Sequence, residues 1–168
     1  MSKNQPISSV DVIPSDTINI PEPGSYLSGA SSTNNLTLTT AGAKFVDGTS
    51  SVGKYQVVAG GDVVIAGAEM ALITSVTSNT TLTLQAPGIT AAAPYNYKIH
   101  RGNGGIPGTN EGNSGYSLYV GGTGDVTAIT QQGEEIVMKN IGNASFIPQQ
   151  VIRVKAAGTT ASDIKALS

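Results

Sequence analysis

The chain has 168 residues, of which 39% are hydrophobic, a formal net charge of −2 and no cysteine. This length and apolar content permit one ordinary domain or two small ones with a core, while the missing cysteines exclude disulfides and thiolate chemistry. Lysines and arginines are scattered singly from Lys3 to Lys165, so no basic stripe is present to neutralise phosphates, and we expect no nucleic-acid partner.

The first predicted element is a short strand near the N-terminus. Ile18 and Ile20 alternate with Thr17 and Asn19, which is typical of a half-buried strand. The following Pro21-Glu22-Pro23-Gly24 ends it, because proline cannot donate a hydrogen bond to a sheet. We place a domain boundary after residue 27.

The middle of the chain predicts a small β-lobe of its own. Two short strands, 36–39 and 62–66, are followed by a hairpin over Glu69 to Gln85 that turns at Ser78-Asn79 and points Leu82 and Leu84 inward. A last strand over 95–99 puts Tyr95 and Tyr97 in the core. Five short strands in this length indicate a small barrel or sandwich. The Gly- and Asn-rich stretch 101–115 then marks a second boundary, which we place after residue 113.

The C-terminal third again alternates apolar and polar residues. We expect strands over 116–120, 126–130, 135–139, 151–157 and 164–167. The glycines of Gly121-Gly122-Thr123-Gly124-Asp125 favour a tight hairpin turn, and Gln131 to Gly133 favours a second reversal. No segment predicts a convincing helix. The expected fold is therefore all-β: a discontinuous small β-sandwich or barrel from residues 1–27 and 114–168, with an inserted small β-barrel lobe at 28–113.

The residue types that could carry chemistry do not form a convincing site. His100 is the only histidine, beside Arg101, and we read it as an ordinary residue at a strand end. Glu134 and Glu135 are adjacent, so on a strand they point to opposite faces and cannot act as a paired acid and base. We expect no catalytic, cofactor-binding or metal-binding residue, and no enzyme.

The glycine-rich turn and one aspartate have alternative interpretations. The segment 121–125 lacks the lysine and the helix of a phosphate-binding loop, and it matches only half of a calcium-binding glycine-aspartate repeat. A plain turn is favoured. Asp62, after Gly60-Gly61, could serve as a metal carboxylate, but we favour a turn residue that bonds nearby backbone amides.

Interaction with other proteins is the stronger expectation. Charged residues make up 12% of the chain, about half the roughly 25% of typical soluble domains, and subunit contacts are depleted in Lys, Glu and Asp. A secreted β protein could also have this composition. Tyr119 faces away from Tyr116 and is the best interface candidate, together with Arg153 and Lys155. Small lobes and β edges that need covering predict a homo-oligomer. Exposed tyrosines also leave open a site for stacking sugars.

A set of segments in a fixed order resembles a known family. Pro14-Ser15-Asp16-Thr17-Ile18 is followed by Leu118-Tyr119-Val120-Gly121-Gly122-Thr123-Gly124-Asp125-Val126, Arg153-Val154 and Gly158-Thr159-Thr160-Ala161. This order is similar to tailed-phage virion proteins, including the spike-base proteins on the heads of phages and gene-transfer agents. Shorter family members run almost directly from the first segment to the second, so residues from about Ser28 to Asn113 would be an insertion. That stretch is itself similar to small β-barrel modules of phage head and tail proteins.

The resemblance implies a non-enzymatic virion protein without a cofactor. It would decorate the head or form the base of a vertex spike, bind the major capsid protein and carry a fibre or spike protein. Alternatives are a tail, neck or baseplate component and a carbohydrate-binding receptor protein of the particle. Residues 1–16 lack the apolar core of a signal peptide, and no apolar run approaches a membrane span. We therefore expect synthesis in the host cytoplasm, no membrane association and a final location in the virion.

Overall fold

The computed structural model describes residues 8–47, 58–102 and 115–168, and these form two compact antiparallel β units. The terminal unit combines the segment up to Gly24 with the C-terminal part of the chain, and the central unit spans Ser25–Gly102. The described residues contain no helix, so the predicted all-β class is confirmed. Accordingly, no helix in these ranges has the length and apolarity to cross a membrane.

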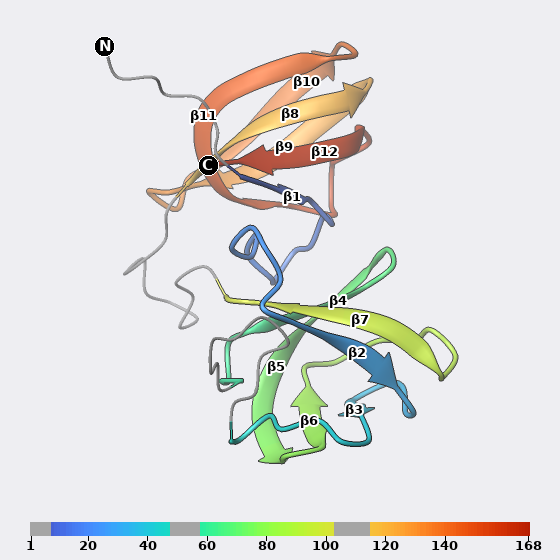
Figure 1. Ribbon diagram of the computed structural model, residues 1–168. Helices are drawn as coiled ribbons and strands as arrows, with labels where there is room; N and C mark the ends of the chain where they lie inside the picture. The colour runs from blue at the N-terminus through green and yellow to red at the C-terminus, as the bar shows by residue number, and fades with distance from the viewer. Residues whose placement is uncertain (1–7, 48–57, 103–114) are drawn as a thin grey trace. The chain divides into compact units, whose positions relative to one another are not determined.

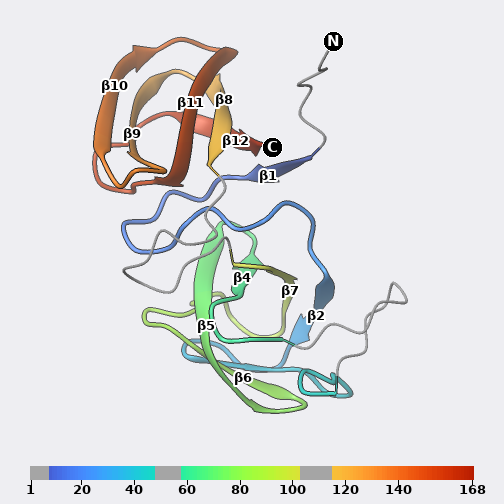
Figure 2. The same ribbon diagram turned by 90° about the vertical axis from the view of Figure 1, so that its left-hand side faces the viewer.

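The terminal unit is one six-stranded sheet in the order β1-β12-β8-β11-β9-β10, which curves around its core (Figures 1 and 2). The N-terminal strand thus pairs with the C-terminal one, with Val10 opposite Ala166. The strands are β1 (Ser9–Asp11), β8 (Tyr116–Gly122), β9 (Gly124–Thr130), β10 (Glu135–Ile141), β11 (Ser145–Val154) and β12 (Ser162–Leu167).

Alternate residues of these strands build the core of the terminal unit. Leu118 and Val120 of β8, Val126 of β9, and Val151 of β11 are fully buried. Ile20 also joins this core and donates its N–H to Ile152 O at 2.9 Å. It does so from an irregular segment, so the predicted strand at 17–20 is wrong, and the N-terminal strand lies at β1 instead. Ser15 N likewise donates to Val154 O at 2.8 Å, so this segment bonds to β11 beyond the end of β8 without forming a regular strand.

The hairpin predicted at Gly121 to Asp125 is also wrong. β8 pairs with β12 and β11, so both of its edges are occupied and β9 must pair elsewhere. The chain instead bends at Thr123 and Gly124, and the start of β9 accepts two N–H donors, from Thr160 (2.9 Å) and Ala161 (3.1 Å), at Asp125 O. The reversal predicted at Gln131 to Gly133 is confirmed, because β9 and β10 pair directly across it.

The central unit is a second six-stranded sheet, in the order β2-β7-β4-β5-β6-β3. Its two outer strands come together, since Ser32 N donates to Thr39 O at 2.8 Å and Thr40 Oγ1 to Ala30 O at 3.1 Å. The sheet is therefore a nearly closed barrel. Its strands are β2 (Leu27–Ser31), β3 (Thr37–Thr39), β4 (Val63–Ala66), β5 (Glu69–Ser78), β6 (Thr81–Leu84) and β7 (Tyr95–His100).

The core of the central unit follows the sequence pattern closely. β5 and β6 form the predicted hairpin, and Leu82 and Leu84 point into the barrel. Tyr95 and Tyr97 are buried on one face of β7, as predicted. Only β2 was missed by the pattern, because Leu27–Ser31 has a single large apolar residue.

Burial of Tyr116 makes the terminal unit sensitive to alkaline pH. Desolvation, and secondarily the Glu22 carboxylate, raises the pKa of the Tyr116 phenol to about 12. The pKa of the phenol in the unfolded chain is about 10. The stability that the neutral Tyr116 phenol contributes is therefore fully present below about pH 10 and is lost as the pH rises through about 12.

We expect the Tyr116→Phe variant to lose less stability than the wild type between about pH 9 and about pH 11.5. The difference should be on the order of 1 to 2 kcal/mol, measured by denaturant unfolding with circular dichroism. Tyr119→Phe, at the exposed position on the same strand, is the control and should follow the wild type. Parallel losses in the wild type and Tyr116→Phe would contradict the assignment.

Candidate interaction surfaces

Four neighbouring strands of the terminal unit align their outward side chains in one row. Asp11 of β1 is opposite Lys165 of β12, Lys165 is opposite Tyr119 of β8, and Tyr119 is opposite Phe146 of β11. Directly opposed residues of antiparallel strands share a face of the sheet. We call these four residues the aromatic row.

The alternation of the strands decides which face the aromatic row occupies. The neighbouring row, one residue along each strand, consists of buried residues that point into the core: Val10, Ala166, Leu118 and Ile147. Successive side chains of a strand point to opposite faces, so the aromatic row must face outward. Phe146 is 57% exposed and Tyr119 is 38% exposed.

The aromatic row combines an apolar end with a charged end. Tyr119 and Phe146 present two rings on adjacent strands, and the next position along the row is an ion pair between Lys165 Nζ and Asp11 Oδ1. Aromatic residues surrounded by polar groups are typical of protein interfaces. The sequence predicted Tyr119 at such a surface and missed Phe146, although Ser145-Phe146-Ile147 carried the signal: one of two adjacent apolar residues in a strand must face outward.

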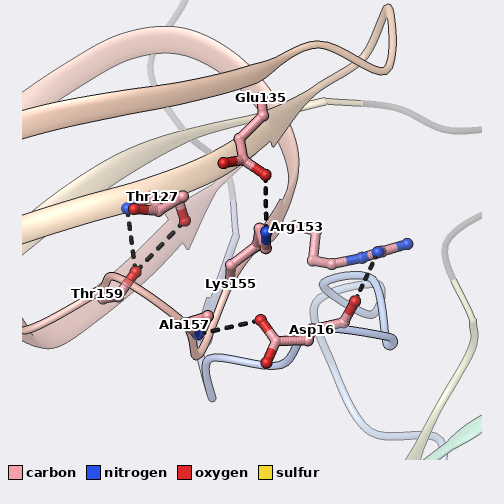
Figure 3. A network of polar contacts seen from close by, with 7 residues as sticks. All are labelled: Asp16, Thr127, Glu135, Arg153, Lys155, Ala157 and Thr159. Carbon is pink, nitrogen blue, oxygen red and sulfur yellow. Dashed lines mark hydrogen bonds and ion pairs between the residues drawn. The ribbon is translucent and has the colours of Figure 1, made fainter.

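Arg153 and Lys155, the other two interface candidates, belong to a polar network within the terminal unit (Figure 3). Arg153 Nε donates to Asn19 Oδ1 at 2.9 Å, and one terminal guanidinium nitrogen donates to Asp16 O at 3.0 Å. The Asp16 carboxylate in turn accepts the N–H of Ala157 at 3.0 Å. Arg153 therefore fastens the irregular N-terminal segment to the sheet.

Lys155 forms an ion pair in the same network. Its Nζ lies 2.7 Å from Glu135 Oε2, and this hydrogen bond raises the pKa of the Lys155 ammonium above its usual value. Beside it, Thr159 Oγ1 accepts the N–H of Thr127 at 3.1 Å (Figure 3). Arg153 and Lys155 thus lie together and hold the fold, whereas Tyr119 lies in the aromatic row.

In the central unit, the Asp62 carboxylate binds residues from both ends of the unit, where the chain enters it and where the chain leaves it. Its carboxylate accepts hydrogen bonds from the Tyr26 hydroxyl (2.5 Å), Arg101 (2.8 Å), Ala59 N (3.0 Å) and Gly102 N (3.4 Å). The guanidinium of Arg101 also lies 4.2 Å from the centre of the Tyr26 ring. Burial, followed by the hydrogen bond to Asp62, raises the pKa of the Tyr26 phenol well above its usual value, so it remains a donor. We call this group the Asp62 clasp.

The remaining residues that the sequence offered as candidates for catalysis or ligand binding have structural roles. Asp62 is the predicted turn residue, since it bonds the amide of Ala59. His100 is buried at the end of β7. The Asp125 carboxylate binds Lys139 Nζ at 2.8 Å and Asn140 N at 2.9 Å, and the Lys139 hydrogen bond lowers its pKa. Within the described ranges, no three His, Asp or Glu side chains gather as a metal site.

Comparison with known proteins adds no assignment. No protein-family model, curated protein or solved structure matches this chain.

Proposed function

We propose that the chain is a structural protein of a tailed-phage or phage-like particle, bound to the head as a decoration protein or as the base of a vertex spike. The major capsid protein is its primary partner, and a fibre or spike protein is the second. The proposal includes no catalytic step and no cofactor. Its final location is the virion, after synthesis in the host cytoplasm.

The observation that carries the proposal is the aromatic row. An outer sheet face with Phe146 57% exposed and Tyr119 38% exposed provides apolar area that a monomer would leave in water, and aromatic anchors dominate the energetics of most protein contacts. The row lies on the unit whose segments resemble the head spike-base family, so we assign capsid binding to this face. We assign contacts with neighbours or with a fibre to the central unit, which is one uninterrupted stretch of the chain, Ser25–Gly102.

Particle purification tests this proposal directly. Particles from cultures of the organism that carries the gene should contain the chain, and cryo-microscopy should locate its density on the head. Density on the tail, neck or baseplate would favour the alternative structural role. Absence of the chain from purified particles would contradict both.

A binding experiment tests the assigned face. Purified Tyr119→Ser/Phe146→Ser protein should bind at least about tenfold more weakly to particles assembled without the chain, because two anchors are lost. Leu36→Ser, at an exposed apolar position of the central unit, is the matched control and should bind like the wild type. Equal binding of all three proteins would exclude the aromatic row as the capsid contact.

Carbohydrate binding is a second candidate, favoured by the same pair of exposed rings. Aromatic rings that lie side by side can stack on the apolar faces of sugars, and the adjacent Lys165–Asp11 pair offers a donor and an acceptor for hydroxyl groups. A glycan array probed with wild type and the Tyr119→Ser/Phe146→Ser variant decides this point. Binding that the double substitution removes would support a receptor role, and an array without binding would reject it.

A further inference from the structure

The edge strand β10 is left with one side unpaired by the described residues. It is the last strand of the terminal sheet, and its only partner there is β9 (Figure 2). The third of its seven residues, Val137, is 51% exposed. An edge of this length is a template for pairing with another strand unless it is protected.

The pairing with β9 determines which backbone groups point to the open side. Thr130 N donates to Glu134 O at 2.9 Å, and the residues of an antiparallel strand bond alternately to its two sides. Ile136 and Met138 therefore bond to β9, while Glu135, Val137 and Lys139 direct their N–H and C=O groups outward. At the far end, Asn140 N is bound by the Asp125 carboxylate at 2.9 Å, in agreement with this alternation.

The side chains of β10 are complementary to those of a second, antiparallel copy of the same strand. In Glu135-Ile136-Val137-Met138-Lys139, an antiparallel copy centred on Val137 places Glu135 opposite Lys139 and Ile136 opposite Met138. Both charges are accessible, since the side chains of Glu135 and Lys139 are 50% and 64% exposed. Ile136 and Met138 already pack against the core, so their cross-strand contacts would extend that core.

Other centres of symmetry within this segment fail. A two-fold axis at Ile136 or Met138 could also use the outward backbone groups, but it places Val137 opposite Glu135 or Lys139 and forms no opposite-charge pair. An axis at Glu135 or Lys139 places like charges opposite each other, which is destabilising. Val137 is the centre that uses the outward backbone groups and also sets Glu135 opposite Lys139.

Ion pairs already present extend the complementarity. Lys139 lies 2.8 Å from the Asp125 carboxylate, and Glu135 lies 2.7 Å from Lys155. With Glu135 of one copy opposite Lys139 of the other, the charges alternate in sign along one series: Asp125, Lys139, then Glu135 and Lys155 of the second copy.

We propose that β10 pairs antiparallel with β10 of a second copy of this chain, about a two-fold axis at Val137. The two terminal sheets then join into one continuous sheet. The proposal concerns self-association and is independent of the location of the protein on a particle. A contact of one edge strand is smaller than a standard interface, so the dimer is concentration-dependent.

Amide hydrogen exchange of the wild-type protein tests the geometry without any substitution. As concentration increases from low micromolar to near millimolar, sedimentation should show a dimer, and the amides of Glu135, Val137 and Lys139 should become protected. The amides of Ile136 and Met138 should be protected at every concentration because they bond to β9. A protein that stays monomeric over this range overturns the proposal, as does a dimer in which the Val137 amide stays unprotected.

Charge reversal gives a second test with a built-in control. Glu135→Lys alone places Lys opposite Lys139, and Lys139→Glu alone places Glu opposite Glu135, so each variant should dimerise at least about tenfold more weakly. An equimolar mixture restores both opposite-charge contacts and should form a heterodimer within about threefold of the wild-type affinity. Each variant is first checked for a folded terminal unit by the protection of Leu118 and Val126. Single variants that associate like the wild type, or a mixture no tighter than either single variant, would overturn the proposal.

Discussion

Replacing Asp62 with alanine is expected to lower the free energy of unfolding of the central unit by about 3 kcal/mol. The Asp62 side chain is only 6% exposed, and the Arg101 side chain that pairs with it is 34% exposed. Removal of the carboxylate leaves the half-buried Tyr26 hydroxyl and the amides of Ala59 and Gly102 without their acceptor. Arg101 can regain water, which keeps the loss at the lower end of the range for broken buried ion pairs.

The loss should be confined to the unit that contains the Asp62 clasp. Amide exchange of Ile73 and Leu82, both buried in the central core, measures the stability of that unit, and exchange of Leu118 and Val126 measures the terminal unit. Asp62→Asn keeps the shape and one acceptor oxygen, so an intermediate loss is expected. Asp47→Ala, which removes an exposed carboxylate bonded to Asn79, should cost less than about 1 kcal/mol. Equal effects of Asp62→Ala and Asp47→Ala would show that the clasp adds little.

Replacing Gly124 with alanine is expected to destabilise the terminal unit by about 3 kcal/mol or to prevent its folding. Gly124 has a φ of +152°, and a Cβ there would lie 2.4 Å from Ala161 N and 2.6 Å from the carbonyl carbon of Thr160. These atoms belong to the segment that donates two hydrogen bonds to Asp125 O. A methyl group must therefore push the start of β9 away from the chain that leads into β12.

Gly142→Ala is the matched control for this substitution. A Cβ at Gly142, in the same unit, meets only Ser145 Oγ at 3.7 Å, an ordinary contact, and Gly142 has no positive φ. Its effect on stability should stay within about 1 kcal/mol, of either sign. Denaturant unfolding followed by circular dichroism compares the three proteins. If Gly124→Ala unfolds at the same denaturant concentration as Gly142→Ala, the close approach of β9 to residues 160–161 is not required for the fold.

The sequence predicted local features well where alternation alone decides them. The β5–β6 hairpin is an example: Leu82 and Leu84 point inward because a period of two leaves one apolar face, and Asn79 accommodates the turn. Burial of Tyr95 and Tyr97 follows from the same rule. Tyr119 was placed on the outer face because Tyr116 and Leu118 had to be inside.

The candidate surfaces could be predicted only in part, because pairing between distant strands creates them. Arg153 was expected at an interface, but its donors bind Asn19 and Asp16 from the other end of the chain. Phe146 becomes part of the aromatic row only because β11 pairs with β8, which places Phe146 opposite Tyr119. No local pattern contains that neighbour.

The sequence by itself determined the β class, the inward and outward positions of most strands and the charge pattern of Glu135 to Lys139, because each depends on residues within one strand. The tertiary structure decided which strands are neighbours. The glycine-rich segment 121–125 was predicted to form a hairpin turn. In the structure it leads to a β9 that does not pair with β8, because β11 and β12 occupy both edges of β8. Among the described residues the tertiary structure also left β10 as an edge strand, with the backbone groups of every second residue directed outward. Strand partners are chosen by the burial of whole faces and by competition for a limited number of edges, which act between segments far apart in the chain.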